Sequence, residues 1–100
     1  MSDQLYYVYV IELSDDVGAR CDPRKPCVYV GQSAVPPKER LQQHLEGYKA
    51  SRWVRDFGTK LKPRLSRNYG PYPTRRESEA AEGRLARRLC RKGFRVFGGH

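Results

Sequence analysis

Glu82 is an acidic residue whose position in its predicted helix is not explained by helix capping or by the helix dipole. With Leu85, Ala86 and Leu89 it follows the spacing i, i+3, i+4, i+7, so it lies on the helix stripe that faces the core or a cleft beside it. Because burying an unpaired carboxylate is costly, Glu82 needs a cation. Two interpretations follow: an ion pair with an arginine of the same chain, or a metal ligand at the rim of an active site.

Arg40 and His44 form a second pair of candidate residues. They are four residues apart in a predicted helix, so they project from one face, beside a stripe that contains Leu41 and Leu45. Arginine suits bidentate contacts with phosphate, and histidine accepts protons near neutral pH. The alternative for His44 is packing, which is the more common role of a lone histidine on a helix flank.

Tyr7, Tyr9 and Tyr29 lie in runs rich in β-branched and aromatic residues, over residues 5–13 and 27–31. The turn-forming residues between the runs make them an antiparallel hairpin with a long loop, which Gly31 closes. Strand packing alone would account for these tyrosines. A tyrosine acts as a base at neutral pH only if cations lower its pKa from about 10.

Helices are predicted at three places in the chain. One begins at Pro36 and Pro37 and ends at Gly47, with Leu41, Leu45 and Tyr48 as its apolar stripe. A short one, capped by Ser51, extends to Phe57 and buries Trp53, Val54 and Phe57, with Gly58 ending it. The third is capped by Thr74 with Glu77 in a capping box, extends to about Lys92 and stops at Gly93.

The remaining segments complete a single domain. Residues 59–73 are basic and rich in proline and glycine, which predicts a loop with at most a short edge strand, and residues 94–100 predict a third strand that returns to the hairpin. One hundred residues suffice for one domain, 1–100. The expected class is α+β: a small antiparallel sheet, made of the hairpin and a third strand, flanked by helices.

Positive charge is concentrated in the second half of the chain. Residues 1–48 hold five basic and seven acidic side chains, whereas residues 49–100 hold fifteen and four. A solvated, solubilising surface is the simplest interpretation. Basic residues interleaved with Tyr48, Trp53, Tyr69 and Tyr72 instead favour a nucleic acid, because phosphates need cations and unpaired bases stack on aromatic rings.

Other function classes are disfavoured. No apolar run is long enough to cross a bilayer, and the N-terminal segment has an acid and no cationic region before its apolar stretch, so no membrane or secretory role is expected. Cys21, Cys27 and Cys90 are an odd number, which favours free thiols in a reducing compartment. Zinc binding by these cysteines with a histidine stays a minor alternative, because their spacing matches no common zinc pattern.

In combination, these segments resemble the GIY-YIG nuclease superfamily, in particular its small stand-alone members. The first motif of the family falls on Tyr7-Val8-Tyr9 and the second on Tyr29-Val30-Gly31. The family arginine falls on Arg40, nine residues past Gly31, and the family acid on Glu82, followed three residues later by a leucine. The chain departs from the pattern in having Tyr7 for the first glycine and a longer loop between the motifs.

The resemblance implies a divalent-metal-dependent endonuclease that hydrolyses phosphodiester bonds in DNA. Glu82 would hold one Mg²⁺ or Mn²⁺, with waters and a phosphate oxygen as the other ligands. Arg40 would contact the scissile phosphate, and Tyr9 or Tyr29 would take the proton of the attacking water. His44 would orient or assist, or itself be the base.

The expected substrate contacts are Tyr7, Gly31, Gln32, Lys60, Lys62, Arg64, Arg67, Arg84 and Arg88. The expected partner is DNA, branched, damaged or otherwise non-B, with RNA as a further substrate class and a protein partner as a source of specificity. A role in DNA repair, in the cytoplasm or on the nucleoid, follows. The alternatives are a nucleic-acid-binding module of the same fold without efficient cleavage, and a ribosomal or other RNA-associated basic protein.

Overall fold

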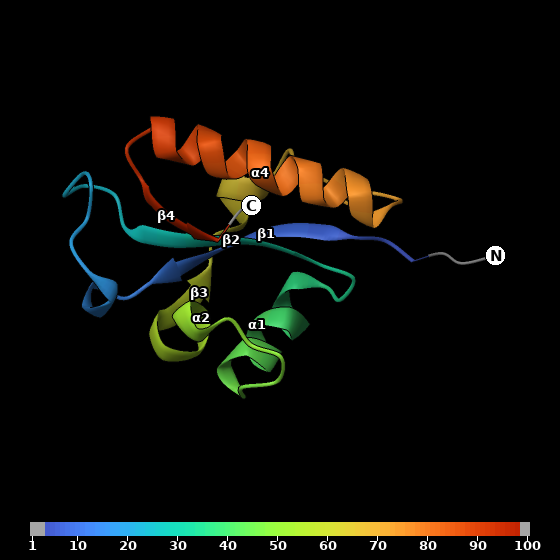
Figure 1. The fold of residues 1–100 in the computed structure, drawn as a ribbon, viewed down its shortest axis with the longest axis horizontal. Helices are drawn as coiled ribbons and strands as arrows, with labels where there is room; N and C mark the ends of the chain where they lie inside the picture. The colour runs from blue at the N-terminus through green and yellow to red at the C-terminus, as the bar shows by residue number, and fades with distance from the viewer. Residues whose placement is uncertain (1–3, 99–100) are drawn as a thin grey trace.

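The computed structural model describes residues 4–98, which form a four-stranded mixed sheet with helices on both faces (Figure 1). The strands are β1 (Tyr7–Leu13), β2 (Cys27–Ser33), β3 (Gly58–Leu61) and β4 (Arg95–Gly98), in the order β3-β1-β2-β4. The helices are the 3₁₀ turn η1 (Asp15–Val17), α1 (Pro37–Leu45), α2 (Arg52–Phe57), α3 (Pro63–Ser66) and α4 (Arg75–Arg91). The α+β class is therefore confirmed.

β1 and β2 form the predicted antiparallel hairpin, with Tyr9 opposite Gly31 and Ile11 opposite Tyr29. β3 adds to β1 as the predicted short edge strand, also antiparallel. β4 is the predicted returning strand, but it pairs with β2 in parallel, so the expectation of an antiparallel sheet is wrong. Because α4 crosses back along the sheet before β4 begins, β4 enters in the same direction as β2. Gly99 and His100, part of the predicted strand, lie outside the described residues.

Each face of the sheet has its own core. Val8, Val10, Val28 and Val30 pack against α4, whose buried residues include Leu85 and Leu89. On the opposite face, Tyr9, Ile11 and Leu13 pack against α1 and α2. Figure 1 shows α4 on one side of the sheet and α1 and α2 on the other. This alternation explains why nearly every residue of β1 is apolar.

The helix termini follow the predicted capping residues. Thr74 accepts a hydrogen bond from the backbone N–H of Glu77, and Ser51 accepts one from Trp53. Gly47 and Gly93 follow α1 and α4 at φ of 85° and 100°, a conformation that favours glycine. Both ends of α4, the element that carries Glu82, are therefore fixed by local sequence.

Three predictions in the helical regions are wrong. The segment predicted as a loop contains α3, which begins at Pro63 and packs Leu65 against the α4 side of the core. Leu45 at the end of α1 and Tyr48 just after the helix are not buried: they are 43% and 52% exposed, and His44 takes the inward position. Trp53 and Phe57 of α2 are only partly buried, whereas Val54 is buried.

Candidate active site

An aromatic cluster lies on the face of the hairpin that α1 and α2 cover, and it consists of Tyr9, Tyr29 and His44. Because Tyr29 lies diagonally across from Tyr9 in the ladder, both side chains leave the same face of the sheet. Their ring centroids are 6.3 Å apart, and the His44 ring lies 6.1 Å from Tyr9 and 5.8 Å from Tyr29. The structure thus brings three of the predicted site residues together from β1, β2 and α1.

Gly31 is required by the closeness of these rings. A Cβ atom at this position would lie 2.6 Å from the Tyr9 hydroxyl and 2.9 Å from Cε1 of Tyr29, well inside van der Waals contact. The glycine that the sequence assigns to closing the hairpin therefore has a second task, which is to leave room for both tyrosines.

His44 is 1% exposed, and both ring nitrogens have hydrogen-bond partners. The backbone N–H of Ser51 donates to Nδ1 at 3.0 Å, and Nε2 lies 2.9 Å from the Tyr9 hydroxyl. Burial and the positive charge of Arg40 lower the pKa of His44 to about 4. The ring is thus neutral at pH 7, and because Nδ1 accepts, its proton is on Nε2 and is donated to Tyr9.

Burial raises the pKa of Tyr9 far above its ordinary value, and the neighbouring Tyr29 raises it further, whereas Arg40 opposes the rise. Burial likewise raises the pKa of Tyr29, while the Ser51 side chain and Arg40 act against it. In the protein alone, the charge of Arg40 therefore does not bring either tyrosine pKa below its ordinary value. Desolvation outweighs the charge of one guanidinium.

Arg40 lies one turn before His44 and is half-buried. Its Nη1 donates to the Gln43 side chain at 3.0 Å and to the Tyr48 carbonyl at 3.2 Å, and its Nη2 donates to the Lys49 carbonyl at 2.7 Å. These bonds use three of the five N–H groups of the guanidinium. The Arg40 side chain also acts on Tyr9 through its charge and a side-chain hydrogen bond, both of which lower the pKa of Tyr9. A guanidinium in this position suits contacts with a phosphate.

Glu82 and Tyr29 line one cleft of about 310 Å³, together with Gly31, Gln32 and Glu79. The negative charge of Glu82 acts on both Tyr9 and Tyr29, raising the pKa of each beyond the effect of burial. Glu79 was not predicted as a site residue, because an acid in the first turns of a helix is already explained by its favourable interaction with the helix dipole. Its spacing of three from Glu82 was the signal that the two share a face.

Gln32 is anchored to α4 where the helix crosses β2. The single hydroxyl hydrogen of Ser78 is donated either to Oε1 of Gln32 or to the Arg75 carbonyl, each 2.8 Å away. The predicted contact residue Gln32 therefore lies in the cleft with its amide oxygen within hydrogen-bond distance of the Ser78 hydroxyl. Gln32 also lines a neighbouring cavity of about 500 Å³ with Arg40, Tyr48 and Lys49, so Arg40 and Glu82 border adjoining cavities.

The other predicted substrate contacts are divided between three places. Tyr7 is half-buried at the start of β1, opposite Ser33. Lys60 is exposed on β3, and Lys62 lies 3.4 Å from Glu12 in an ion pair. The four arginines line pockets between α3 and α4 and do not line the cleft: Arg64, Arg67, Arg84 and Arg88.

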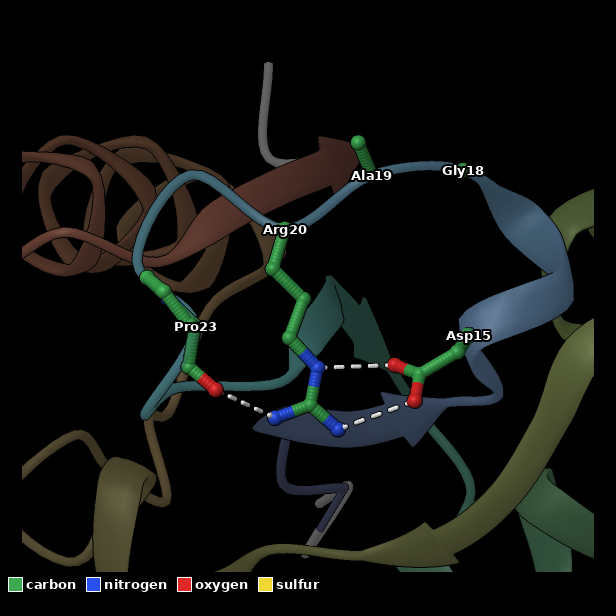
Figure 2. Close-up of a pocket in the computed structure, with 5 residues that line it drawn as sticks. All are labelled: Asp15, Gly18, Ala19, Arg20 and Pro23. Atoms are coloured by element: carbon green, nitrogen blue, oxygen red, sulfur yellow. Dashed lines mark hydrogen bonds and ion pairs between the residues drawn. The ribbon is translucent and has the colours of Figure 1, made fainter.

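A separate pocket of about 510 Å³ lies in the loop between β1 and β2 (Figure 2). There Arg20 donates to both carboxylate oxygens of Asp15, at 2.7 and 3.2 Å, and to the Pro23 carbonyl. The charges of Asp15 and Arg20 thus compensate each other within the loop. Their ion pair stabilises a segment of irregular backbone. Near it, Cys27 is buried and Cys21 is exposed, and all three cysteines of the chain are free thiols.

The donor set of the cleft fits one hard cation. Two carboxylates, an amide and a phenol supply oxygen donors, which Mg²⁺ and Mn²⁺ prefer, and the open space admits waters. Within residues 4–98, no three histidine, cysteine, aspartate or glutamate side chains gather into a metal-binding group. Glu82, with Glu79 beside it, therefore fits a cation that keeps most of its water ligands.

Within the described part of the chain, no helix has the length and apolar character that a bilayer span requires. No family model matches the sequence, and no curated protein or solved structure is significantly similar to it.

Proposed function

We propose that this protein is a divalent-metal-dependent endonuclease that hydrolyses phosphodiester bonds in DNA. The observation that carries the proposal is the shared cleft of Tyr29 and Glu82. Arg40 borders the adjoining cavity, and Tyr9 and His44 lie directly behind Tyr29. These side chains come from four elements, and hairpin packing alone does not require an acid and an arginine beside the same tyrosine.

The arrangement also supports the resemblance to the GIY-YIG superfamily. The two motif segments lie side by side as β1 and β2, with Tyr9 paired to Gly31. The arginine falls on the first helix after the hairpin and the acid on the long helix that covers the opposite face of the sheet. A chain of this family would use these residues as one site.

The basic and the acidic side chains of the site have separate tasks. Arg40 binds a non-bridging oxygen of the scissile phosphate and offsets the charge that develops as water attacks. Glu82, with Glu79 beside it, would hold the cation, which would supply Lewis-acid chemistry next to the phosphate. Gln32 orients the phosphate from the floor of the cleft.

Tyr29 is the proton acceptor in this proposal, in preference to Tyr9 and His44. It would act as a phenolate, a form that the charges of Arg40 and of the cation would favour. Tyr29 lines the cleft, whereas Tyr9 is 2% exposed and its hydroxyl contacts His44. His44 lacks a free lone pair, because Nδ1 accepts from Ser51 and Nε2 carries the proton. His44 therefore acts as a positioning residue that holds Tyr9 against Tyr29.

A binding module without cleavage is the second candidate. It is favoured by the raised pKa values of both tyrosines, which make either a poor base in the protein alone, and by a basic surface that lies apart from the cleft. Phosphate binding on that surface needs neither Tyr29 nor Glu82.

A cleavage assay on linear, nicked, flapped and four-way DNA with Mg²⁺ or Mn²⁺ separates the two candidates. We expect metal-dependent cleavage that falls at least about 100-fold in Tyr29→Phe and in Glu82→Ala. Tyr6→Phe, which removes a hydroxyl outside the cleft, is the matched control and should cleave normally. Tight binding without cleavage of any substrate would favour the module, and a preference for structured RNA would favour an RNA-associated protein.

A further inference from the structure

The cavity that adjoins the candidate active site lies where the chain leaves β2, and its volume is about 500 Å³. That volume is within the range of cavities that hold small organic ligands. Residues from the end of β2, from α1 and the turn after it, and from the start of α4 line it. We call this cavity the turn pocket, and its lining includes Val35, Arg40, Tyr48, Lys49 and Arg75.

The turn pocket is positively charged. Arg40, Lys49 and Arg75 line it, and among the residues that the structure describes no aspartate or glutamate does. A hollow lined by charges of one sign and walled by protein of low dielectric concentrates their field on whatever enters it. The pocket therefore suits an anion, and phosphate is an anion to which both arginine and lysine are well matched.

Tyr48 gives the same pocket an aromatic surface. The residue is 52% exposed, and Nζ of Lys49 lies 5.6 Å from the centroid of its ring. Packing in the core therefore does not account for this side chain. An accessible aromatic ring is a surface on which any nucleobase can stack, because every base has a π face. The base must be unpaired, since the bases of a duplex already stack on their neighbours.

The turn that carries Tyr48 and Lys49 is fixed by side chains of α1. The guanidinium of Arg40 donates to the carbonyls of both residues, at 3.2 and 2.7 Å, and Nδ1 of His44 accepts from the backbone N–H of Ser51. Lys49 has a φ of 43°, a left-handed conformation that lysine rarely adopts. The hydrogen bonds from Arg40 offset the cost of this conformation. Because the turn is already ordered, a ligand that binds there loses little affinity to ordering it.

We propose that the turn pocket binds a nucleotide with an unpaired base, which stacks on Tyr48 while Lys49 and Arg75 hold the phosphate. A ligand that combines a planar ring with an anion uses both the aromatic and the cationic surface. Inorganic phosphate uses only the cations, and an acidic peptide supplies charge without a base. The nucleotide is either a free mononucleotide or part of a strand that continues into the cleft, because Gln32 lines both cavities. The inference goes beyond the proposed function, since binding here needs neither Glu82 nor cleavage.

The test follows the backbone amide signals of isotope-labelled protein by NMR in EDTA, so that neither a metal ion nor cleavage contributes. The probes are adenosine monophosphate, adenosine, inorganic phosphate and a short single strand of deoxyadenylate. We expect a nucleotide probe to shift the signals of Val35 and Lys49 and to leave that of Arg20, in the pocket of the β1–β2 loop, unmoved. Adenosine and phosphate should each bind at least about tenfold more weakly than the nucleotide, because each uses one of the two surfaces.

Two substitutions separate the contributions of ring and charge. Tyr48→Ala should weaken nucleotide binding at least about fivefold because stacking is lost, whereas Tyr48→Phe should bind normally. Lys49→Asn removes the charge and keeps a residue that tolerates positive φ. It should weaken the binding of nucleotide and phosphate and leave that of adenosine nearly unchanged. Both substitutions keep the backbone carbonyls to which Arg40 donates.

The matched control is Leu45→Ala, which removes another exposed side chain of α1, outside the turn pocket, and should bind every probe normally. Shifts with adenosine monophosphate support a free nucleotide as the ligand, and shifts with the single strand alone support a nucleotide within a strand. Unmoved pocket signals with both probes, a loss in Tyr48→Phe equal to that in Tyr48→Ala, or equally tight binding of a triglutamate peptide would overturn the inference. If a nucleotide binds but the protein never cleaves DNA, only the proposed function fails. If the protein cleaves DNA and neither nucleotide probe reaches the pocket, only this inference fails.

Discussion

His44 illustrates how one residue type supports several interpretations until its partners are known. The spacing of four residues placed His44 on the same helix face as Arg40. A surface role, a packing role and a catalytic role were all compatible with that position. The structure buries it and engages both ring nitrogens, with Ser51 seven residues later supplying one partner. No sequence pattern announces that contact, because it depends on how the turn between α1 and α2 folds back.

Protonation of His44 should destabilise the fold as the pH falls from 6.5 to 4. Its pKa is lowered in the folded protein to about 4, so in this window the unfolded chain binds the extra proton and the free energy of unfolding falls with decreasing pH. We expect a loss on the order of 2 kcal/mol, measured by urea unfolding at several pH values. His44→Gln should flatten this pH dependence, and a wild-type stability that stays constant from pH 6.5 to 4 would contradict the burial of a neutral His44.

At the scale of elements, local signals predicted most of the fold. The runs of β-branched and aromatic residues predicted β1 and β2, and the prolines at its start predicted α1. The capping residues Ser51 and Thr74 predicted α2 and α4, and β3 was expected as a short edge strand. The direction of β4 and the helix α3 were missed. Strand direction depends on a pairing between residues about 70 positions apart, Cys27 and Arg95, and α3 is a single turn that gains its packing from Leu65.

The contact between β1 and β2 gives a prediction for Gly31→Ala. The added methyl group meets Oη and Cζ of Tyr9 at 2.6 and 2.7 Å, so the tyrosines must shift. Overpacking of this kind should cost about 1–3 kcal/mol in the free energy of unfolding and reduce cleavage more than it reduces DNA binding. Gly47→Ala is the control: its Cβ meets nothing within 4 Å, so it should carry a backbone cost and cleave normally. Equal cleavage by Gly31→Ala and the wild type would show that the tyrosine positions are unimportant.

At the scale of the whole molecule, the sequence predicted an uneven charge distribution but not its geometry. Counting charges by halves of the chain indicated one basic face. The structure instead places the acidic cleft and the pockets lined by Arg64, Arg67, Arg84 and Arg88 apart from each other, with no lining residue in common, and it adds Glu79 to the cleft. This separation arises from the packing of α3 beside α4, which charge counting along the chain cannot reveal.

The most direct test of the central claim is a single measurement of DNA occupancy and cleavage on wild-type protein and Glu82→Gln in Mg²⁺ or Mn²⁺. The variant keeps the shape of the side chain and removes one negative charge beside the phosphate, so it should bind DNA at least as tightly as the wild type. Without the carboxylate that holds the cation, its cleavage rate at saturating protein should fall at least about 100-fold. Undiminished cleavage by Glu82→Gln, or no cleavage by the wild type when all the DNA is bound, would contradict the account.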